Sequence, residues 1–302
     1  MNAAVPTDAL RRPPAVGVIA NALTIDVEDY FQVSAFAPHI ARSEWDQREC
    51  RVERNVEAIL GMLAAQRTHA TFFTLGWLAE RYPSLVRSIV AAGHELASHG
   101  YGHQRASDLT PEAFRHDVVH AKQILEDLCG VEVRGYRAPS FSIGTGNLWA
   151  FDVLAQAGYR YSSSVYPIRH DHYGMPDSPR FAHPVAGGLI EIPVSTVRLL
   201  NRNLPSSGGG YFRLYPYALS RWMLRQVNRV DGEPAIFYLH PWELDVDQPR
   251  IPGISAKTRF RHYLNLSRMR ERLEQLLVDF RWDRMDRIFL DAPAPALSLR
   301  AA

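Results

Sequence analysis

Short apolar runs alternate with longer segments of helical periodicity along most of the chain. Seven of these runs predict β-strands, because short apolar runs bounded by polar or turn-forming residues are typical of buried strands. The predicted strands span residues 16–26, 70–75, 95–99, 133–137, 160–164, 189–194 and 235–240. Since helical segments separate most of them, the pattern favours parallel βαβ units in an α/β fold, arranged as an open sheet or as a barrel.

The intervening segments carry one-sided apolar patterns that predict helices. In the clearest one, Thr110 suits the N-cap, Pro111 the first helical position and Gly130 the end of the helix. Two apolar stripes each follow one helix face: Val52, Val56, Ile59, Leu60 and Leu63, and Phe114, Val118, Ala121, Leu125 and Leu128. Further helices are predicted over residues 217–230 and 267–280, and the arginine-rich segment 259–272 predicts an amphipathic helix with a solvated basic face.

Composition and charge narrow the class of protein. The hydrophobic fraction of 46% and charged fraction of 22% are typical of globular proteins. With 34 basic and 32 acidic residues the net charge is +2, which argues against nucleic acid as a main partner. Cys50 and Cys129 form no disulfide or thiolate-metal pattern, and no run approaches the length of a membrane span. We therefore expect a cytoplasmic protein without an integral membrane segment.

Polar residues stand at the carboxyl ends of four predicted strands. These residues are Asp26, His99, Arg137 and His240. In a barrel of parallel strands such ends converge on one mouth, where the chemistry of the fold is built. An open sheet would place them in a row. The sequence therefore predicts that four distant segments contribute to one cavity.

His99 and His103 form a candidate metal-binding pair. Two histidines four residues apart can direct both imidazoles at one divalent cation, although this spacing is also common on solvated helix faces. Three carboxylates upstream, Asp26, Glu28 and Asp29, strengthen the metal hypothesis. Histidine and carboxylate ligands suit Zn²⁺, Co²⁺ and Ni²⁺, so the pattern does not choose among them.

Taken together, these motifs resemble those of the polysaccharide deacetylases of carbohydrate esterase family 4. The resemblance covers residues 19 to 245 and includes the order of the motifs as well as their residues. The subgroup associated with exosortase-linked exopolysaccharide gene clusters is similar in five segments: LTIDVEDYFQVSAF, GHELASHGYGH, GYRAPSFSI, EIPVSTVRLL and GGGYFRLYP.

The resemblance implies an α/β fold of the polysaccharide deacetylase type, a distorted (β/α)₇ TIM-like barrel. We expect residues 16–291 to form a single catalytic barrel with a C-terminal helical extension, between tails at residues 1–15 and 292–302. Residues 166–188 are expected to be an irregular insertion near the active site. The glycine-rich segment 206–211 suits a flexible turn or, as we favour, a loop that borders the substrate.

The resemblance also implies roles for the strand-end residues in metal-dependent hydrolysis of N-acetyl groups. Asp26 would be the base that takes a proton from water, held by an ion pair with Arg137. His240 would be the acid that protonates the departing amine. One divalent ion, with Zn²⁺ favoured and Co²⁺ or Ni²⁺ as alternatives, would be held by a carboxylate together with His99 and His103.

Two departures from the family pattern leave alternatives open. Val27 and Glu28 separate the aspartates, so the metal carboxylate is either Glu28 or Asp29, and we slightly favour Asp29. The family's usual aspartate that tunes the catalytic histidine is replaced here by residues 161–164, so the residue orienting His240 is open, with Glu243 and Asp245 as candidates.

The expected substrate is an N-acetylated amino sugar of a bacterial exopolysaccharide or its precursor. Substrate contacts are expected at Tyr136, Pro139, Tyr211 and Trp242, whose aromatic members suit either sugar stacking or core packing. Association with a membrane polysaccharide-synthesis complex is left open. Two other functions remain as alternatives: hydrolysis of a cyclic amide such as allantoin without the full metal set, and a catalytically silent carbohydrate-binding role.

Overall fold

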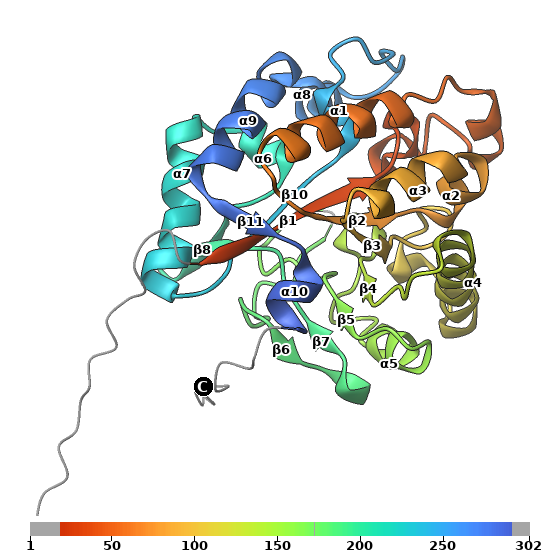
Figure 1. Ribbon diagram of the computed structural model, residues 1–302, viewed down its shortest axis with the longest axis horizontal. Coiled ribbons are helices and arrows are strands. Elements are labelled where there is room, and N and C mark those ends of the chain that lie inside the picture. Colours follow the sequence, from red (N-terminus) through yellow and green to blue (C-terminus); the bar gives the residue numbers. More distant parts are fainter. Residues whose placement is uncertain (1–18, 172, 292–302) are drawn as a thin grey trace, which may run out of the picture.

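The parallel strands of the protein form one curled sheet with helices outside it (Figure 1). The computed structural model describes residues 19–171 and 173–291; the tails predicted at residues 1–15 and 292–302 lie outside these ranges. Eight strands follow the path β10-β1-β2-β3-β4-β5-β7-β6, and β11 also pairs with β1. Their bounds are β1 (Ala20–Val27), β2 (Thr71–Thr74), β3 (Glu95–Ser98), β4 (Gly135–Tyr136), β5 (Tyr161–Ser162), β6 (His183–Pro184), β7 (Ile190–Glu191), β10 (Ile236–Leu239) and β11 (Arg281–Asp283).

The seven predicted strands are all present, and neighbours along β10-β1-β2-β3-β4-β5-β7 are parallel. Within the described residues, β7 and β10 are not joined by a ladder. Instead, the hydroxyl of Ser195 accepts a hydrogen bond from the amide of Ile236 at 2.7 Å. The fold is therefore the expected distorted (β/α)₇ barrel, with one seam between β7 and β10.

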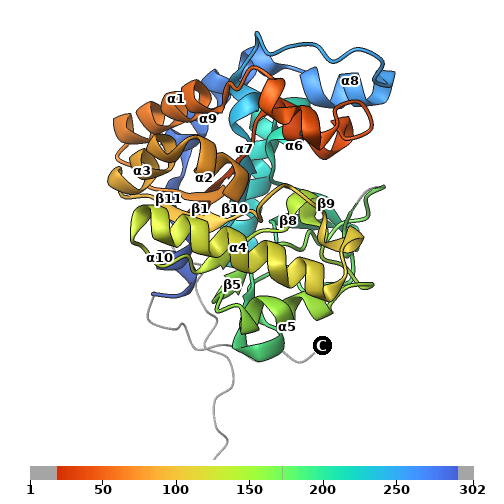
Figure 2. The ribbon, with the colours of Figure 1, turned by 90° about the vertical axis from the view of Figure 1, so that its right-hand side faces the viewer.

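Helices cover the sheet on its outer side. Figure 2 shows α4 and α5 on the same side of the molecule, where their apolar residues form one core cluster with Tyr136 of β4. Thr110 caps α4 and Gly130 ends it in a left-handed conformation, as the sequence predicts. Within the described ranges, no helix is both long and apolar enough to span a bilayer. The helices are α1 (Val52–Ala65), α2 (Gly76–Arg81), α3 (Pro83–Ala91), α4 (Pro111–Cys129), α5 (Trp149–Gln156), α6 (Gly209–Leu214), α7 (Tyr217–Gln226), α8 (Ala256–Tyr263), α9 (Met269–Asp279) and α10 (Met285–Phe289).

Two predictions about local structure were wrong. The segment 259–272 is not one helix, because Asn265 adopts a left-handed conformation with φ of 51° and separates α8 from α9. The glycine-rich segment 206–211 is not simply a loop, since Gly208 precedes α6 and Gly209 begins it. A Cβ atom on Gly209 would lie 1.8 Å from the Glu243 carboxylate, so this glycine allows α6 to approach the segment after β10.

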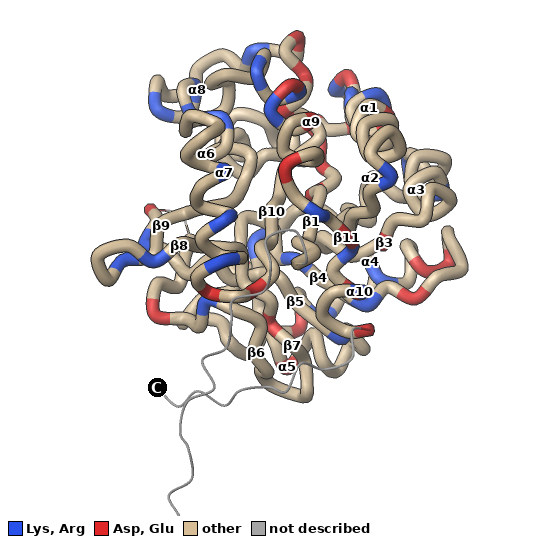
Figure 3. Tube along the Cα trace, turned by 60° about the vertical axis from the view of Figure 1, so that its left-hand side comes forward, with Lys and Arg blue, Asp and Glu red and all other residues tan. Residues whose placement is uncertain are grey.

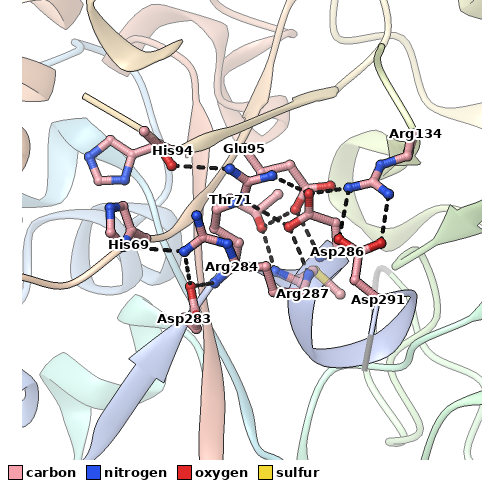
Figure 4. Close-up of polar contacts among 12 residues, drawn as sticks. His69, Thr71, His94, Glu95, Arg134, Asp283, Arg284, Asp286, Arg287 and Asp291 are labelled. Carbon is pink, nitrogen blue, oxygen red and sulfur yellow. Dashed lines mark hydrogen bonds and ion pairs between the residues drawn. The ribbon is translucent and has the colours of Figure 1, made fainter. Parts of the chain in front are cut away.

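The C-terminal segment packs against the first residues of β2 and β3, where Figure 4 shows a cluster of polar contacts. The amide of Met285 donates to the Thr71 hydroxyl at 2.8 Å, and that of Asp286 donates to Oε2 of Glu95 at 3.1 Å. Arg134 and Arg284 both form ion pairs with Asp286. This cluster lies at the first residues of β2 and β3, at the end opposite to the predicted cavity, so it stabilises the fold and leaves the other end for chemistry.

Candidate active site

The carboxyl ends of the strands bring the predicted polar residues into one buried group. Asp26 and Glu28 come from the end of β1 and the residue after it, and His99 and Arg137 directly follow β3 and β4. All four are at most 3% exposed. His240 follows β10, and its side chain is 21% exposed. The imidazole therefore faces the opening of the site, and the carboxylates lie beneath it.

Glu28, His99 and His103 form a group whose potential ligand atoms all lie within 4.8 Å of one another. His103 follows the turn that Gly100 starts with φ of 76°, and it has a positive φ of 54° itself. Such strain in a non-glycine residue is often found at functional sites. Nδ1 of His99 must donate to the carbonyl of Arg137, 2.8 Å away, which leaves Nε2 with the lone pair that a metal requires.

These residues fit a divalent cation. Oε2 of Glu28 is buried and lies 2.6 Å from Nε2 of His103. Burial lowers the pKa of His99 to about 4, so its imidazole is neutral. Burial alone would raise the pKa of Glu28, but His103 and His240 outweigh it and hold the pKa well below the usual value. A neutral imidazole and an ionised carboxylate are the forms that bind metal.

Asp29 lies outside this group, so the slight preference for Asp29 over Glu28 is corrected. Its carboxylate turns away and accepts backbone hydrogen bonds from Tyr30 at 2.7 Å and Val52 at 2.8 Å. It also accepts from the amide of Arg51 and the thiol of Cys50. Asp29 therefore caps the turn after β1 and joins it to the start of α1.

Asp26 is held by Arg137. Nη1 of Arg137 lies 2.6 Å from Oδ1 of Asp26 and also donates to the hydroxyl of Thr24 at 2.8 Å. The other guanidinium nitrogens donate to the carbonyl and hydroxyl of Ser163 at 3.1 Å and 3.0 Å. Ser163 belongs to the segment that replaces the family's usual aspartate, and here it orients Arg137. Oδ2 of Asp26 lies 3.9 Å from Nε2 of His240.

His240 is oriented by Glu243. Nδ1 of His240 lies 3.3 Å from Oε2 of Glu243, which also accepts from the His240 amide at 2.9 Å. Burial would lower the pKa of His240, but Glu28 and Glu243 raise it to about 9. Asp245, the other candidate, forms ion pairs with Arg51 at 2.6 Å and Arg54 at 2.9 Å instead.

Sequence reasoning missed Arg213. Its Nε lies 3.0 Å from Oε1 of Glu243, and both side chains are at most 1% exposed. Burial would raise the pKa of Glu243, but Arg213 and His240 lower it to about 2. Arg213 lies within the GGGYFRLYP segment, so the resemblance included it without indicating its partner.

The predicted substrate contacts are dispersed. Tyr136 is 1% exposed and packs in the core against Phe114, and Pro139 is buried at the start of a 3₁₀ turn. Trp242 is 5% exposed, and its indole donates to Oε1 of Glu28 at 3.0 Å, so it orients a carboxylate of the candidate metal-binding group. Tyr211 is half-buried and lines a cavity described below.

Two family models match adjoining parts of the chain. Residues 44–162 match the model described as polysaccharide deacetylase, and residues 163–290 match that of a domain of unknown function, DUF3473. The boundary falls directly after β5, within the sheet. Residues of the site come from both matched segments and, before them, from the end of β1 and the residue that follows it.

Named relatives and a solved structure are similar to the chain. It is 24% identical over 168 residues to a peptidoglycan-N-acetylglucosamine deacetylase of Bacillus cereus, covering 52% of this chain and 60% of that protein. It is 34% identical over 109 residues to a chitooligosaccharide deacetylase of Bradyrhizobium sp., covering 36% and 47%. The chain thus spans about half the length of these relatives. The crystal structure of a putative polysaccharide deacetylase from Mycobacterium smegmatis superposes with a TM-score of 0.59 at 22% identity, covering 95% of this chain and 93% of that one, and supports the fold.

Proposed function

Because the chain belongs to the polysaccharide deacetylase family, we propose that it is a metal-dependent enzyme that removes N-acetyl groups from amino sugars of a bacterial exopolysaccharide or its precursor. The observation that carries this proposal is the buried group of Glu28, His99 and His103 beside the Asp26–Arg137 pair and His240. The exopolysaccharide substrate is supported by the five segments that resemble the exosortase-associated subgroup.

Glu28, His99 and His103 would hold one divalent ion, with Zn²⁺ favoured and Co²⁺ or Ni²⁺ as alternatives. Two histidines and one carboxylate are a set that leaves coordination positions open. When bound, the cation would acidify a water molecule and polarise the acetyl carbonyl. The indole of Trp242 orients Glu28, and the carbonyl of Arg137 orients His99.

Asp26 would act as the general base. Its Oδ1 is occupied by Arg137, whereas Oδ2 faces His240 at 3.9 Å, so Oδ2 is the oxygen that can take a proton from water. His240 would act as the general acid through Nε2, because Nδ1 faces Glu243. A raised pKa keeps this imidazole protonated, the form required to protonate the departing amine.

The catalytic unit would extend over residues 16–291. His99 and Arg137 come from the segment matched by the deacetylase model, and His240 from the segment matched by DUF3473. Glu28 precedes both. We place the protein in the cytoplasm. Its partner would be an N-acetylated glycan and not a nucleic acid, and an association with a polysaccharide-synthesis complex is a matter for experiment.

Acetate release and metal analysis test the proposal. The protein loaded with Zn²⁺ should release acetate from N-acetylated oligosaccharides, and Asp26→Asn and His240→Ala should lose turnover while retaining metal. His116→Ala, at an exposed position on α4, is the matched control. Full activity of either site variant would overturn the mechanism. Glycan binding without acetate release would favour the carbohydrate-binding alternative, and opening of allantoin would favour the cyclic amide alternative.

A further inference from the structure

A cavity of about 870 Å³ lies between two parts of the molecule. One side is formed by the irregular segment 173–181 together with Ile168 and Arg169, and the other by the hairpin of β8 (Thr196–Leu199) and β9 (Arg202–Pro205). None of the proposed catalytic or metal-binding residues lines it. The proposed mechanism therefore does not use this cavity. Its volume suits a small ligand or part of a larger one.

Arginine dominates the charge of this cavity. Its described lining includes Arg169, Arg180, Arg198 and Arg202, with Asp177 as the one acidic residue. Arg180 is occupied, because it forms an ion pair with Asp231 at 2.8 Å and donates to the carbonyl of Thr196 at 2.6 Å. This arrangement fastens the irregular segment to the start of β8.

The other three arginines are available to a ligand. Arg169, Arg198 and Arg202 are exposed, and no ion pair joins them to any residue in the described ranges. Figure 3 shows basic positions on the β8–β9 hairpin. Because a guanidinium presents a planar set of donors, it suits the paired oxygens of a carboxylate or a phosphate.

Neutral polar groups and an aromatic ring complete the lining. Ser178 is 7% exposed, and its hydroxyl is buried without a hydrogen-bond partner among the described residues. Asn203 and Tyr211 also line the cavity. Amides, hydroxyls and an aromatic face are groups that bind sugars, so the lining is suited to a saccharide that carries negative charge.

We infer that this arginine-lined cavity binds an anionic group, a carboxylate or a phosphate, on a part of the glycan remote from the acetyl group that is removed. The inference rests on the proposed function, since it takes the substrate to be a glycan. Ile168 and Tyr211 connect the two sites, because both line the cavity, Ile168 belongs to the apolar cluster around Tyr238, and Tyr211 packs against that cluster. The Tyr238 ring lies 5.8 Å from that of His240.

Binding to sugars without an acetyl group tests this inference separately from deacetylation. Calorimetry on the full chain should show tighter binding of tetragalacturonate than of neutral maltotetraose, and raised salt should weaken only the former. Replacing two exposed arginines, Arg198→Gln with Arg202→Gln, should weaken tetragalacturonate binding about tenfold. Arg87→Gln with Arg270→Gln, which removes the same charge from α3 and α9, is the matched control.

The outcomes distinguish the two anions and the two proposals. Binding of glucose 1-phosphate in preference to glucuronate, lost in the Arg198/Arg202 variant, would support the site and identify a phosphate. The reverse preference would support it and identify a carboxylate. Equal affinity for tetragalacturonate and maltotetraose, or equal loss in the control variant, would overturn the inference. Since tetragalacturonate carries no acetyl group, none of these results depends on acetate release.

Discussion

Nδ1 of His240 lies 3.3 Å from Oε2 of Glu243, whose other oxygen lies 3.0 Å from Nε of Arg213. The contact leaves Nε2 of His240 facing Asp26 and Glu28, at 3.9 Å and 3.6 Å. Glu243, three residues after His240, thus provides the carboxylate that the family pattern would place in segment 161–164. Glu243 is therefore close to His240 in the sequence, whereas Arg213 is far from both.

Replacing Glu243 should impair the general acid without removing the metal. In Glu243→Gln the imidazole loses the carboxylate that orients and charges it, so we expect kcat to fall by about 10–100-fold, the usual effect of losing an outer partner. KM and metal content should change little. Steady-state kinetics and metal analysis measure this. The buried guanidinium of Arg213 still has a side-chain carbonyl to contact, which favours folding of the variant.

The matched variant Arg213→Lys should show a smaller loss of kcat, because a lysine keeps the charge but not the geometry of the pair. Thermal unfolding of both variants provides the control for folding. If Glu243→Gln retains the full kcat, the orienting role is wrong.

Glu28 and Asp29 should respond to substitution in opposite ways. Glu28→Gln removes a proposed ligand, so the metal affinity should fall by more than the roughly 10–100-fold that follows loss of an outer partner. Asp29→Asn should bind metal normally, but its free energy of unfolding should be about 1–3 kcal/mol lower, because the native Asp29 carboxylate accepts three backbone hydrogen bonds. Metal titration and denaturant unfolding of the two variants distinguish these effects. Loss of metal in Asp29→Asn alone would restore Asp29 as the ligand.

The strands and the strand-end residues could be predicted because they depend on local pattern. An apolar run followed by a polar residue marks both the strand and the position where the side chain reaches the mouth of a barrel. Asp26 and His99 follow this rule. The start and end of α4 could be predicted for the same reason, since Thr110 and Gly130 act on the backbone next to them.

The choice between Glu28 and Asp29 could not be made locally. Asp29 leaves the site because its carboxylate meets the amides of Arg51 and Val52, which are 22 and 23 residues away in sequence. The pairing of Arg213 with Glu243 also depends on distant contact, since α6 must approach the segment after β10. The break at Asn265 was missed because the apolar pattern continues through it.

Trp242 should act on metal binding rather than on the sugar. Trp242→Phe removes the indole donor to Oε1 of Glu28 while keeping an aromatic ring beside His240, 5.1 Å away in the native protein. We expect metal affinity to fall by about tenfold and KM at saturating metal to stay unchanged. Competition with a chelator measures the metal affinity, and steady-state kinetics measure KM. A raised KM with unaltered metal affinity would return Trp242 to a substrate-binding role.

Glu95 should make stability fall as the pH rises. Burial and the neighbouring Asp286 carboxylate raise the pKa of Glu95 to about 7, from 4.5 for an unperturbed glutamate (Figure 4). The folded state therefore holds this proton more tightly than the unfolded state, so the stabilisation is complete below pH 4.5 and is lost as the pH rises through about 7. The neutral substitute Glu95→Gln should remove this decline. Urea unfolding at pH 5, 6, 7 and 8 measures it, with Glu112→Gln, exposed at the start of α4, as the control. An unchanged slope in Glu95→Gln would show that the ionisation of Glu95 does not cause the decline, which would overturn the prediction.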